Sequence, residues 1–302
     1  MADPFHPPPL HSGRPGLVAP VRVDPQGAAG HWLGAPWFDG STPDDSRQLP
    51  VVLASAAVDI REQDGIRLTR ERLNPRDILT VDGVRVTNAA RSVFFEMRYA
   101  ATLRDAVVLL DMAAFSDLIS IDEVAAYAEM HPGWTGVPQA RRALLLGEEN
   151  TWSPAEARMR MIWQLDAGLP RPLCNRPIFD LHGRHIGTPD LFDPVSGTLG
   201  EYDGALHLTG QARSRDVARE SAFRDFALEC FTVLGPDVRD RAGTAARMIQ
   251  ARRRARWLPE DERPWTLTPP PWWQESHTVA LRRQLTGRAR QRVLEFRARL
   301  AS

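Results

Sequence analysis

The order of helix-like and strand-like segments in the second half of the chain constrains its fold more than any other feature. The segment SPAEARMRMIWQLDAGL has Pro154 at the first helical position and a stop at Gly168, as expected of a helix. Three strand-like runs follow: LCNRPIFD, RHIGTPDLF and GTLGEYD. A helix over about 213–229, the short strand CFTVLG and a long Arg-rich helix come next. This order predicts a compact α/β unit with a mixed β-sheet flanked by helices.

The first half of the chain places its strands before its helices. Alternating segments fill residues 50–90, and VDGV within them predicts a hairpin turn. Four helices are expected next, the first capped by Thr87 or Asn88. The second covers TLRDAVVLLDMAAFS, the third opens with the capping box SIDE, and the fourth lies around PQARRALLLGEEN. Residues 51–150 are therefore expected to form an α+β domain with a small sheet and a helical bundle.

Two further segments flank these units. Residues 1–50 are rich in Pro and Gly and predict a loosely ordered arm. After the α/β unit, which covers 151–257, residues 258–302 are expected to form a Pro/Trp linker and a basic helix. Within them RPWTLTPPPWW (263–273) is expected to lack regular structure, and one helix is expected over about 277–300.

Basic charge is concentrated at the C-terminal end of the chain. All 38 basic residues are Arg, and the chain contains no Lys, which excludes any mechanism that needs a lysine amine. Residues 241–302 hold 14 Arg against 5 Asp or Glu, a net charge of +9, whereas the whole chain has a net charge of zero. A basic tail beside an acidic body indicates a polyanionic partner such as DNA. A solvated amphipathic helix is the alternative explanation.

Composition also suggests the compartment. Cys174 and Cys230 are far apart and lack metal-ligand spacing, so reduced thiols and a cytoplasmic location are expected. No run of about 18 apolar residues predicts a membrane span, and the first residues do not resemble a signal peptide.

Three acidic residues near two strand ends suggest a metal centre. A hairpin over TPDLFDPVSGTLGEYD would place Asp190 beside Glu201, and alternation puts Glu201 and Asp203 on one face. Carboxylates gathered in this way repel one another unless a cation neutralises them. Oxygen-only ligands suit Mg²⁺ or Mn²⁺, and water activated by such an ion can cleave a phosphodiester. An acidic surface hairpin is the alternative.

Other side chains could complete this site. Glu156 could assist the metal or simply complete a capping box with Ser153, and these roles are compatible. His207 could transfer protons near neutral pH, or it could be a hydrogen-bonded turn residue.

Arginines that could contact phosphates lie on two predicted helices. Arg215 and Arg219 share a helical turn with Asp216, which could instead pair with Arg219. In the basic tail, the candidates for phosphate contact are Arg252, Arg253 and Arg254.

The motifs SPAEARMR, DAGLPRP, TPDLFDP, GEYDGALH and RDVARESAFRD occur in order over residues 153–256. This region resembles the Vsr-like endonuclease domain (domain of unknown function 559) of the PD-(D/E)XK nuclease superfamily. The resemblance implies a restriction-endonuclease-like fold, a divalent metal and cleavage of DNA. Its site residues fall on Glu156, Pro189, Asp190, Glu201, Asp203, Gly204 and His207. The superfamily lysine position holds Asp203 here, and the Vsr-like group, which also lacks that lysine, is thought to use histidine, so His207 takes this role.

Residues of about 50–150, through DILTVDGVRVTNAARSVFFEMR and RDAVVLLDMA, resemble the AbiEi-type antitoxin family. Such proteins usually begin with a DNA-binding winged helix, of which GLVAPVRV resembles one strand. Together the two resemblances imply a metal-dependent DNA endonuclease of a toxin–antitoxin-like or defence system, with a toxin or another protein as a further partner. Two alternatives are a non-catalytic DNA-binding regulator or antitoxin, and a protein scaffold that uses PPPWW.

Overall fold

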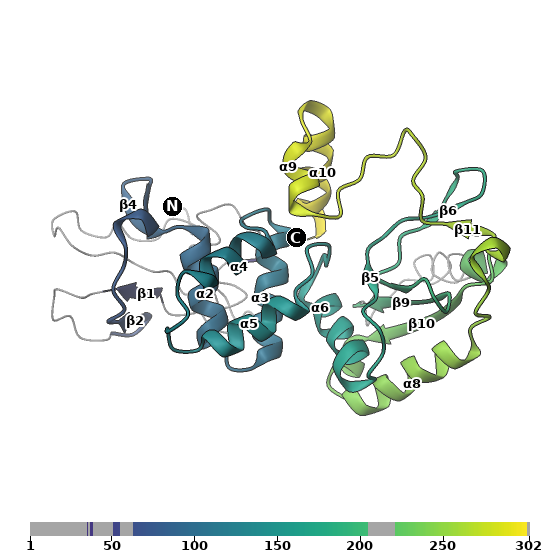
Figure 1. The fold of residues 1–302 in the computed structure, drawn as a ribbon, viewed down its shortest axis with the longest axis horizontal. Helices are drawn as coiled ribbons and strands as arrows, with labels where there is room; N and C mark the ends of the chain where they lie inside the picture. Colours follow the sequence, from purple (N-terminus) through teal and green to yellow (C-terminus); the bar gives the residue numbers. More distant parts are fainter. Residues whose placement is uncertain (1–34, 36, 39–50, 55–62, 205–220, 301–302) are drawn as a thin grey trace, which may run out of the picture.

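The computed structural model describes residues 35, 37–38, 51–54, 63–204 and 221–300. These residues form helices and several sheets, one of them mixed, so the protein belongs to the mixed α/β class. The N-terminal strands lie at one end of the long axis, a group of helices occupies the middle, and the mixed sheet lies at the other end (Figure 1).

Two strand pairs begin the described chain. The strand β1 (Val51–Ala54) pairs in parallel with β2 (Ile66–Thr69). The strands β3 (Ile78–Val81) and β4 (Val84–Thr87) pair antiparallel. Between β3 and β4 the φ angles of Asp82 and Gly83 are 50° and 79°. Positive φ at both central residues is what a two-residue type I′ turn needs, so the predicted VDGV hairpin is confirmed.

Four helices follow and pack against one another. They are α2 (Ala89–Tyr99), α3 (Leu103–Phe115), α4 (Ile121–Glu129) and α5 (Val137–Leu146). Asn88 caps α2 by accepting a hydrogen bond from the backbone N–H of Arg91, and Ser120 and Glu123 form the predicted capping box on α4. Their core includes the fully buried Phe94 and Leu110.

The helix α6 (Pro154–Met161) links the two halves of the protein. It begins at the cap Ser153, continues as one π-helical turn over Ile162–Asp166 and ends before Gly168, whose φ is 61°. Ala157 packs in the core of the helical bundle, and Met159 packs in the core beneath the mixed sheet. The predicted boundary near residue 151 therefore lies just before a helix that both cores share.

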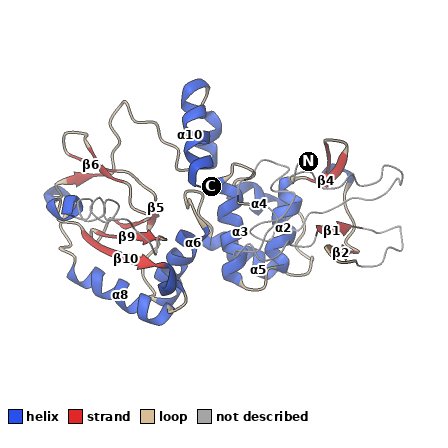
Figure 2. Ribbon diagram, turned by 180° about the vertical axis from the view of Figure 1, so that it is seen from behind, coloured by secondary structure: helices blue, strands red, loops and turns tan. Residues whose placement is uncertain are grey.

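The mixed sheet contains the four strands β5 (Leu173–Cys174), β8 (Leu191–Asp193), β9 (Thr198–Asp203) and β10 (Glu229–Leu234), in the order β10–β9–β8–β5. The strand β10 runs parallel to β9, and the other pairs are antiparallel. The helix α8 (Arg241–Arg254) runs along β9 and β10 (Figures 1 and 2) and buries Met248 against this sheet. The mixed sheet predicted from element order is thus present.

The first two strand-like runs are each divided between two sheets. Their outer parts, β6 (Ile178–Asp180) and β7 (His185–Gly187), form a separate sheet with β11 (Trp265–Thr266), in the order β11–β6–β7. Pro177 lies between β5 and β6, and Pro189 lies between β7 and β8. Because proline has no N–H to donate, the strand pairing stops at both positions and the chain bends.

The C-terminal segment departs from the sequence prediction in two places. The strand β11 (Trp265–Thr266) pairs with β6, although residues 263–273 were expected to lack regular structure. Burial of Trp265 in the core beneath this sheet stabilises the pair, which joins residues too distant in sequence to predict. The single helix expected over 277–300 is two helices, α9 (Val279–Gln284) and α10 (Gly287–Leu300), because Leu285 is extended and Gly287 has a φ of 51°.

The structure also bears on the predicted helix near residue 220, on the two cysteines and on membrane spans. Within the helix expected at about 213–229, residues 221–225 are helical, the part before them lies outside the described residues, and β10 already begins at Glu229. Cys174 and Cys230 form no disulfide in the described part of the chain, in line with the expected reduced thiols. Among the described residues, no helix has the length and apolar character that crossing a membrane requires.

Candidate functional site

The acidic cluster lies where β5 and β8 bend away from the mixed sheet. Cys174 pairs with Leu191, so the next position places Asn175 opposite Asp190. The backbone N–H of Asn175 donates to the carbonyl oxygen of Asp190 at 3.2 Å. The two bends therefore bring an amide and a carboxylate to one end of the sheet.

The hairpin of β8 and β9 adds Glu201 to this end. Leu191 pairs with Gly200 in antiparallel register, and the next position along places Asp190 opposite Glu201. Directly opposed residues of an antiparallel pair project from the same face of the sheet. The Oδ2 atom of Asp190 also accepts a hydrogen bond of 2.6 Å from the backbone N–H of Tyr202. Asp190 is thus held against β9, beside Glu201.

Glu156 joins the cluster from the first turn of α6, where it is 9% exposed. Its Oε1 atom accepts from the Ser153 hydroxyl at 3.0 Å, and its Oε2 atom accepts from the backbone N–H of Trp152 at 2.9 Å. Asn175 Nδ2 also donates to Oε2, at 2.8 Å. Glu156 therefore stabilises the start of its own helix, but through the N–H of Trp152 and the hydroxyl of Ser153 and not through the Ser153 N–H that a capping box uses. Its hydrogen bond with Asn175 also connects it to the acids of the sheet.

The electrostatics of Glu156 reflect these surroundings. Burial, and then the negative charge of Asp190, raise the pKa of Glu156 to about 8, although hydrogen bonds from Asn175 and Trp152 act in the opposite direction. At neutral pH its carboxyl group consequently carries a proton for most of the time. Repulsion between Asp190 and Glu156 is what a cation bound between them would relieve.

Two buried asparagines hold the cluster together, and the sequence analysis missed both. Asn150 Nδ2 donates to the carbonyl oxygens of Cys174 at 2.6 Å and Asn175 at 3.0 Å, and Asn175 Nδ2 donates in return to the carbonyl oxygen of Asn150 at 2.8 Å. Asn175 has a φ of 48°, a left-handed conformation that Asn tolerates better than most residues. An Asn before Arg-Pro in a strand-like run was the only signal in the sequence.

The remaining predicted site residues are placed as follows. Asp203 ends β9 two residues after Glu201, so the two share a face of that strand. Three candidates lie outside the described residues: His207, Arg215 and Arg219.

Two of the three predicted phosphate-binding arginines of α8 already have acidic partners. Arg252 pairs with the buried Asp193 at 2.8 Å and lies over the ring of Trp257. Arg254 pairs with Glu229 at 2.6 Å, although its side chain is 59% exposed. Arg253 is exposed and forms no ion pair with the described residues. Arg253 is thus the member of the three best placed to meet a phosphate.

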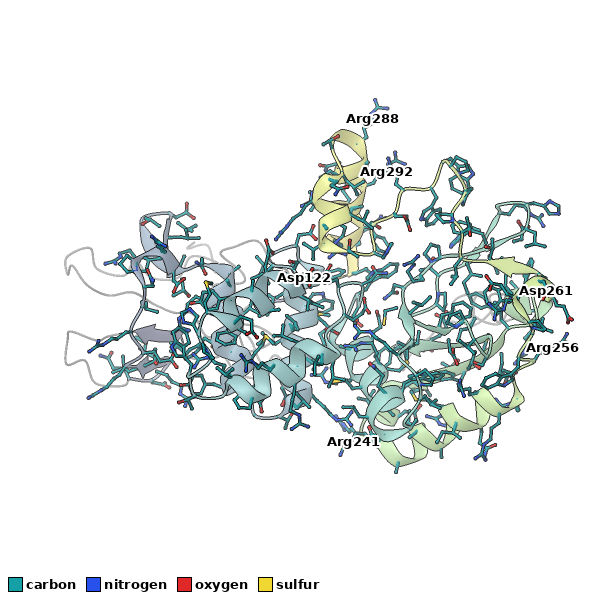
Figure 3. The ribbon with its side chains drawn as sticks, viewed as in Figure 1. Asp122, Arg241, Arg256, Asp261, Arg288 and Arg292 are labelled. Carbon is teal, nitrogen blue, oxygen red and sulfur yellow. The ribbon has the colours of Figure 1, made fainter. Side chains whose placement is uncertain are left out.

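The basic tail divides in a similar way. Asp117 forms ion pairs with three arginines of the last two helices: Arg282, Arg290 and Arg297. By contrast, Arg288 and Arg292 point outward from α10, and Arg256 projects just beyond the end of α8 (Figure 3). Arg241, at the other end of α8, is exposed but lies 3.9 Å from Asp166. Some arginines of the basic tail therefore form ion pairs that hold the fold together, and others face solvent.

A hard divalent cation matches the donor chemistry of the acidic cluster. Asp190 and Glu201 supply carboxylate oxygens from adjacent strands. Within the described ranges, no group of three His, Cys, Asp or Glu side chains is arranged so that it could hold a metal ion. Mg²⁺ usually takes one or two protein carboxylates and retains several waters, so two carboxylates are sufficient for it.

No family model matches the chain, and neither a curated protein nor a solved structure gives a significant match. The function of the protein is therefore inferred from its own residues.

Proposed function

We propose that residues 151–257 are a metal-dependent endonuclease domain that hydrolyses DNA phosphodiesters. The observation that supports this proposal is a series of hydrogen bonds that connects α6, the end of β5, the start of β8, and β9. It runs from Glu156 to Asn175 at 2.8 Å, from Asn175 to Asp190 at 3.2 Å, and from Asp190 to Tyr202 at 2.6 Å. Acids distant in sequence are thereby held at one end of a mixed sheet, as the resemblance to the Vsr-like nucleases implies.

In this proposal Asp190 and Glu201 hold Mg²⁺ or Mn²⁺, and Glu156 and Asp203 assist. The bound ion supplies Lewis-acid stabilisation of the phosphate and a water of lowered pKa. Asn175 keeps Glu156 directed at the cluster through their 2.8 Å hydrogen bond. Once deprotonated, Glu156 would offer a further carboxylate to the group that would hold the ion.

Proton transfer and phosphate binding are assigned to residues predicted from the sequence. His207 handles protons near neutral pH. Arg215 and Arg219 lie a few residues further along the chain, and the exposed Arg253 of α8 belongs to the same unit. Guanidinium groups suit phosphates because they donate two parallel hydrogen bonds.

Plasmid cleavage tests the enzyme. Supercoiled DNA is incubated with the native chain and Mg²⁺ or Mn²⁺, alongside Asp190→Asn and Glu201→Gln. Nicking should fall at least about 100-fold in both variants, because each removes one charged ligand. Asp261→Asn changes an exposed acid far from the cluster (Figure 3) and should cleave normally. Cleavage that survives both site substitutions contradicts the proposal.

A second candidate is a non-catalytic DNA-binding regulator or antitoxin. It is favoured by the outward arginines Arg288 and Arg292 on α10, which suit sequence-independent contact with phosphates (Figure 3). This candidate predicts that the native chain does not cleave DNA. It also predicts that DNA binding weakens steeply as the salt concentration rises, equally in Asp190→Asn and in the native chain. A toxin–antitoxin or defence setting, with the AbiEi-like residues 51–150, fits either candidate.

A further inference from the structure

A cavity lies directly behind the acidic cluster, and the proposed metal chemistry does not use it. Its volume is about 310 Å³, at the lower end of the range typical of small-ligand sites. Its walls come from separate parts of the chain: the loop before α6, the bend between β5 and β6, the segment after β11, and α10. The segment from β11 to α9 runs from the sheet unit back toward the helical bundle (Figure 1), and its residues line one side of the cavity.

Aromatic rings line the cavity from three places. Trp152 precedes α6, Trp273 belongs to the Pro-rich segment, and Phe296 lies on α10. The rings of Trp152 and Phe296 meet edge to face with centroids 4.8 Å apart. Trp273 is fixed by Phe179, with ring centroids 5.0 Å apart. Aromatic walls held in this way are suited to a flat ligand.

Polar groups occur among these rings. Arg176 and Ser276 line the same cavity and offer hydrogen-bond donors and acceptors, whereas the Nδ2 group of Asn150, also in the wall, already donates to Cys174 and Asn175. Asn175, which is 2% exposed, also lines it, and its Oδ1 atom is buried without a hydrogen-bond partner among the described residues. A buried acceptor without a partner costs about 1–3 kcal/mol, and a ligand or a water that reached it would offset this cost.

The cavity and the acidic cluster share a wall. Asn175 lines the cavity and donates to Glu156, and the backbone N–H of Trp152 donates to the same Oε2 atom of Glu156. Thr188 also lines the cavity and lies two residues before Asp190. A nucleotide with its phosphate at the acids would therefore have its base beside the aromatic rings.

We propose that this cavity receives one unstacked nucleobase of the DNA strand that the acidic cluster cleaves. The inference rests on the proposed nuclease function and specifies its substrate: DNA with an unpaired or extruded nucleotide at the cleavage site. Enzymes that take a base out of the helix bind it between aromatic side chains and read its edge with polar groups. The rings of Trp152, Trp273 and Phe296 supply the stacking contact, and the Oδ1 atom of Asn175, with Arg176 and Ser276, supplies the polar contact.

Binding of bulged duplexes tests the proposal without cleavage. Fluorescent duplexes carry a single-nucleotide bulge, with each of the four bases in turn, or the same bulge with the base absent. Affinities are measured by anisotropy in EDTA with the native chain, Phe296→Ala and Leu294→Ala. Leu294 is the matched control, because it lies on the same helix and is 44% exposed, against 36% for Phe296, but does not line the cavity.

The native chain and Leu294→Ala should bind at least one base-containing bulge more than about fivefold tighter than the abasic bulge, since stacking one base contributes about 1–3 kcal/mol. Phe296→Ala should lose most of this difference. Equal affinity for all bulges in the native chain, or an unchanged difference in Phe296→Ala, overturns the proposal. Ser276→Trp, which fills the cavity from another segment, should give the same loss and guards against a folding defect in Phe296→Ala.

Cleavage of the same duplexes in Mg²⁺ separates the two proposals. If the native chain distinguishes base from abasic bulge but does not cleave, the nuclease assignment fails and the base-binding cavity remains. If it cleaves the abasic bulge as fast as the others and binds all of them equally, the cavity proposal alone fails.

Discussion

Asp117 is the anchor of the last two helices, and removing its charge should release them. Its Oδ1 atom lies 2.7 Å from Arg282 Nε, and its Oδ2 atom lies 2.7 Å from Arg290 Nη1 and 3.0 Å from Arg297 Nη1. The side chains of Asp117, Arg282 and Arg297 are 5%, 2% and 9% exposed. One carboxylate therefore forms ion pairs with two buried guanidinium groups and one half-buried group.

The substitution Asp117→Asn removes the charge and keeps the shape. Asn also tolerates the left-handed backbone at this position, where φ is 57°. Leaving a buried charge without its partner costs about 3–5 kcal/mol. Arg282 keeps its hydrogen bonds to the carbonyl oxygens of Ala114 and Ser276, which places the expected loss near the lower value. A loss of about 3 kcal/mol corresponds to an increase on the order of 100-fold in the undocked population.

Hydrogen–deuterium exchange of residues 279–300 measures this effect directly. Protection of α9 and α10 should fall on the order of 100-fold in Asp117→Asn, while protection of α3 should fall less. Asp122→Asn, which changes an exposed acid on the neighbouring α4 (Figure 3), serves as the control and should behave like the native chain. Unchanged protection of α9 and α10 in Asp117→Asn would refute the anchoring role.

The same anchor predicts how docking depends on pH. Burial raises the pKa of Asp117, but the charges of Arg297 and Arg282, together with hydrogen bonds from Arg282 and Arg290, outweigh burial and lower it below the ordinary value. A carboxyl group with a lowered folded-state pKa stabilises the docked state fully above its unfolded pKa of about 3.9. Docking should therefore be constant at neutral pH and weaken only in acid, as pH falls through the lowered pKa.

Two further substitutions test the cores. Arg160→Met should destabilise the protein by about 3–5 kcal/mol in urea unfolding, because the fully buried Asp111, 2.7 Å away, loses its partner. A double variant that also carries Asp111→Leu should recover much of this stability. If the double variant recovers none of it, the pairing argument is contradicted. Gly200→Ala should lower the free energy of unfolding by about 1–3 kcal/mol, because the added Cβ would lie 2.3 Å from the Phe231 ring. Gly133→Ala is the control and should be neutral, because its Cβ meets nothing within 4 Å. Equal stability of the two glycine variants would refute the packing argument.

Several elements could be predicted from local sequence because local interactions form them. The VDGV turn needs two positive φ angles, which Asp82 and Gly83 adopt, and the caps at Asn88 and Ser120 satisfy N–H groups within three residues. The hairpin that places Asp190 beside Glu201 follows from one short turn between two apolar runs. Such features depend on neighbours in the chain, so the sequence alone indicates them.

Other features needed residues from distant segments. The split of the strand-like runs at Pro177 and Pro189 was missed, because alternation does not tell which sheet a strand joins. The strand at Trp265 exists only because β6 is there to pair with it. Likewise, Arg252 pairs with Asp193 from 59 residues away, so its charge could not be assigned to DNA or to structure in advance.

By itself the sequence determined the mixed α/β class, the order of the elements, and a set of acids that a hairpin would gather. Only the tertiary structure decided which groups surround those acids: the amides of Asn150 and Asn175, the burial of Glu156, and a cavity lined on one side by the C-terminal segment. The physical reason is the separation along the chain between the groups that interact. Turns and caps are set by bonds between near neighbours, whereas burial and electrostatic environment depend on every segment that folds against a group.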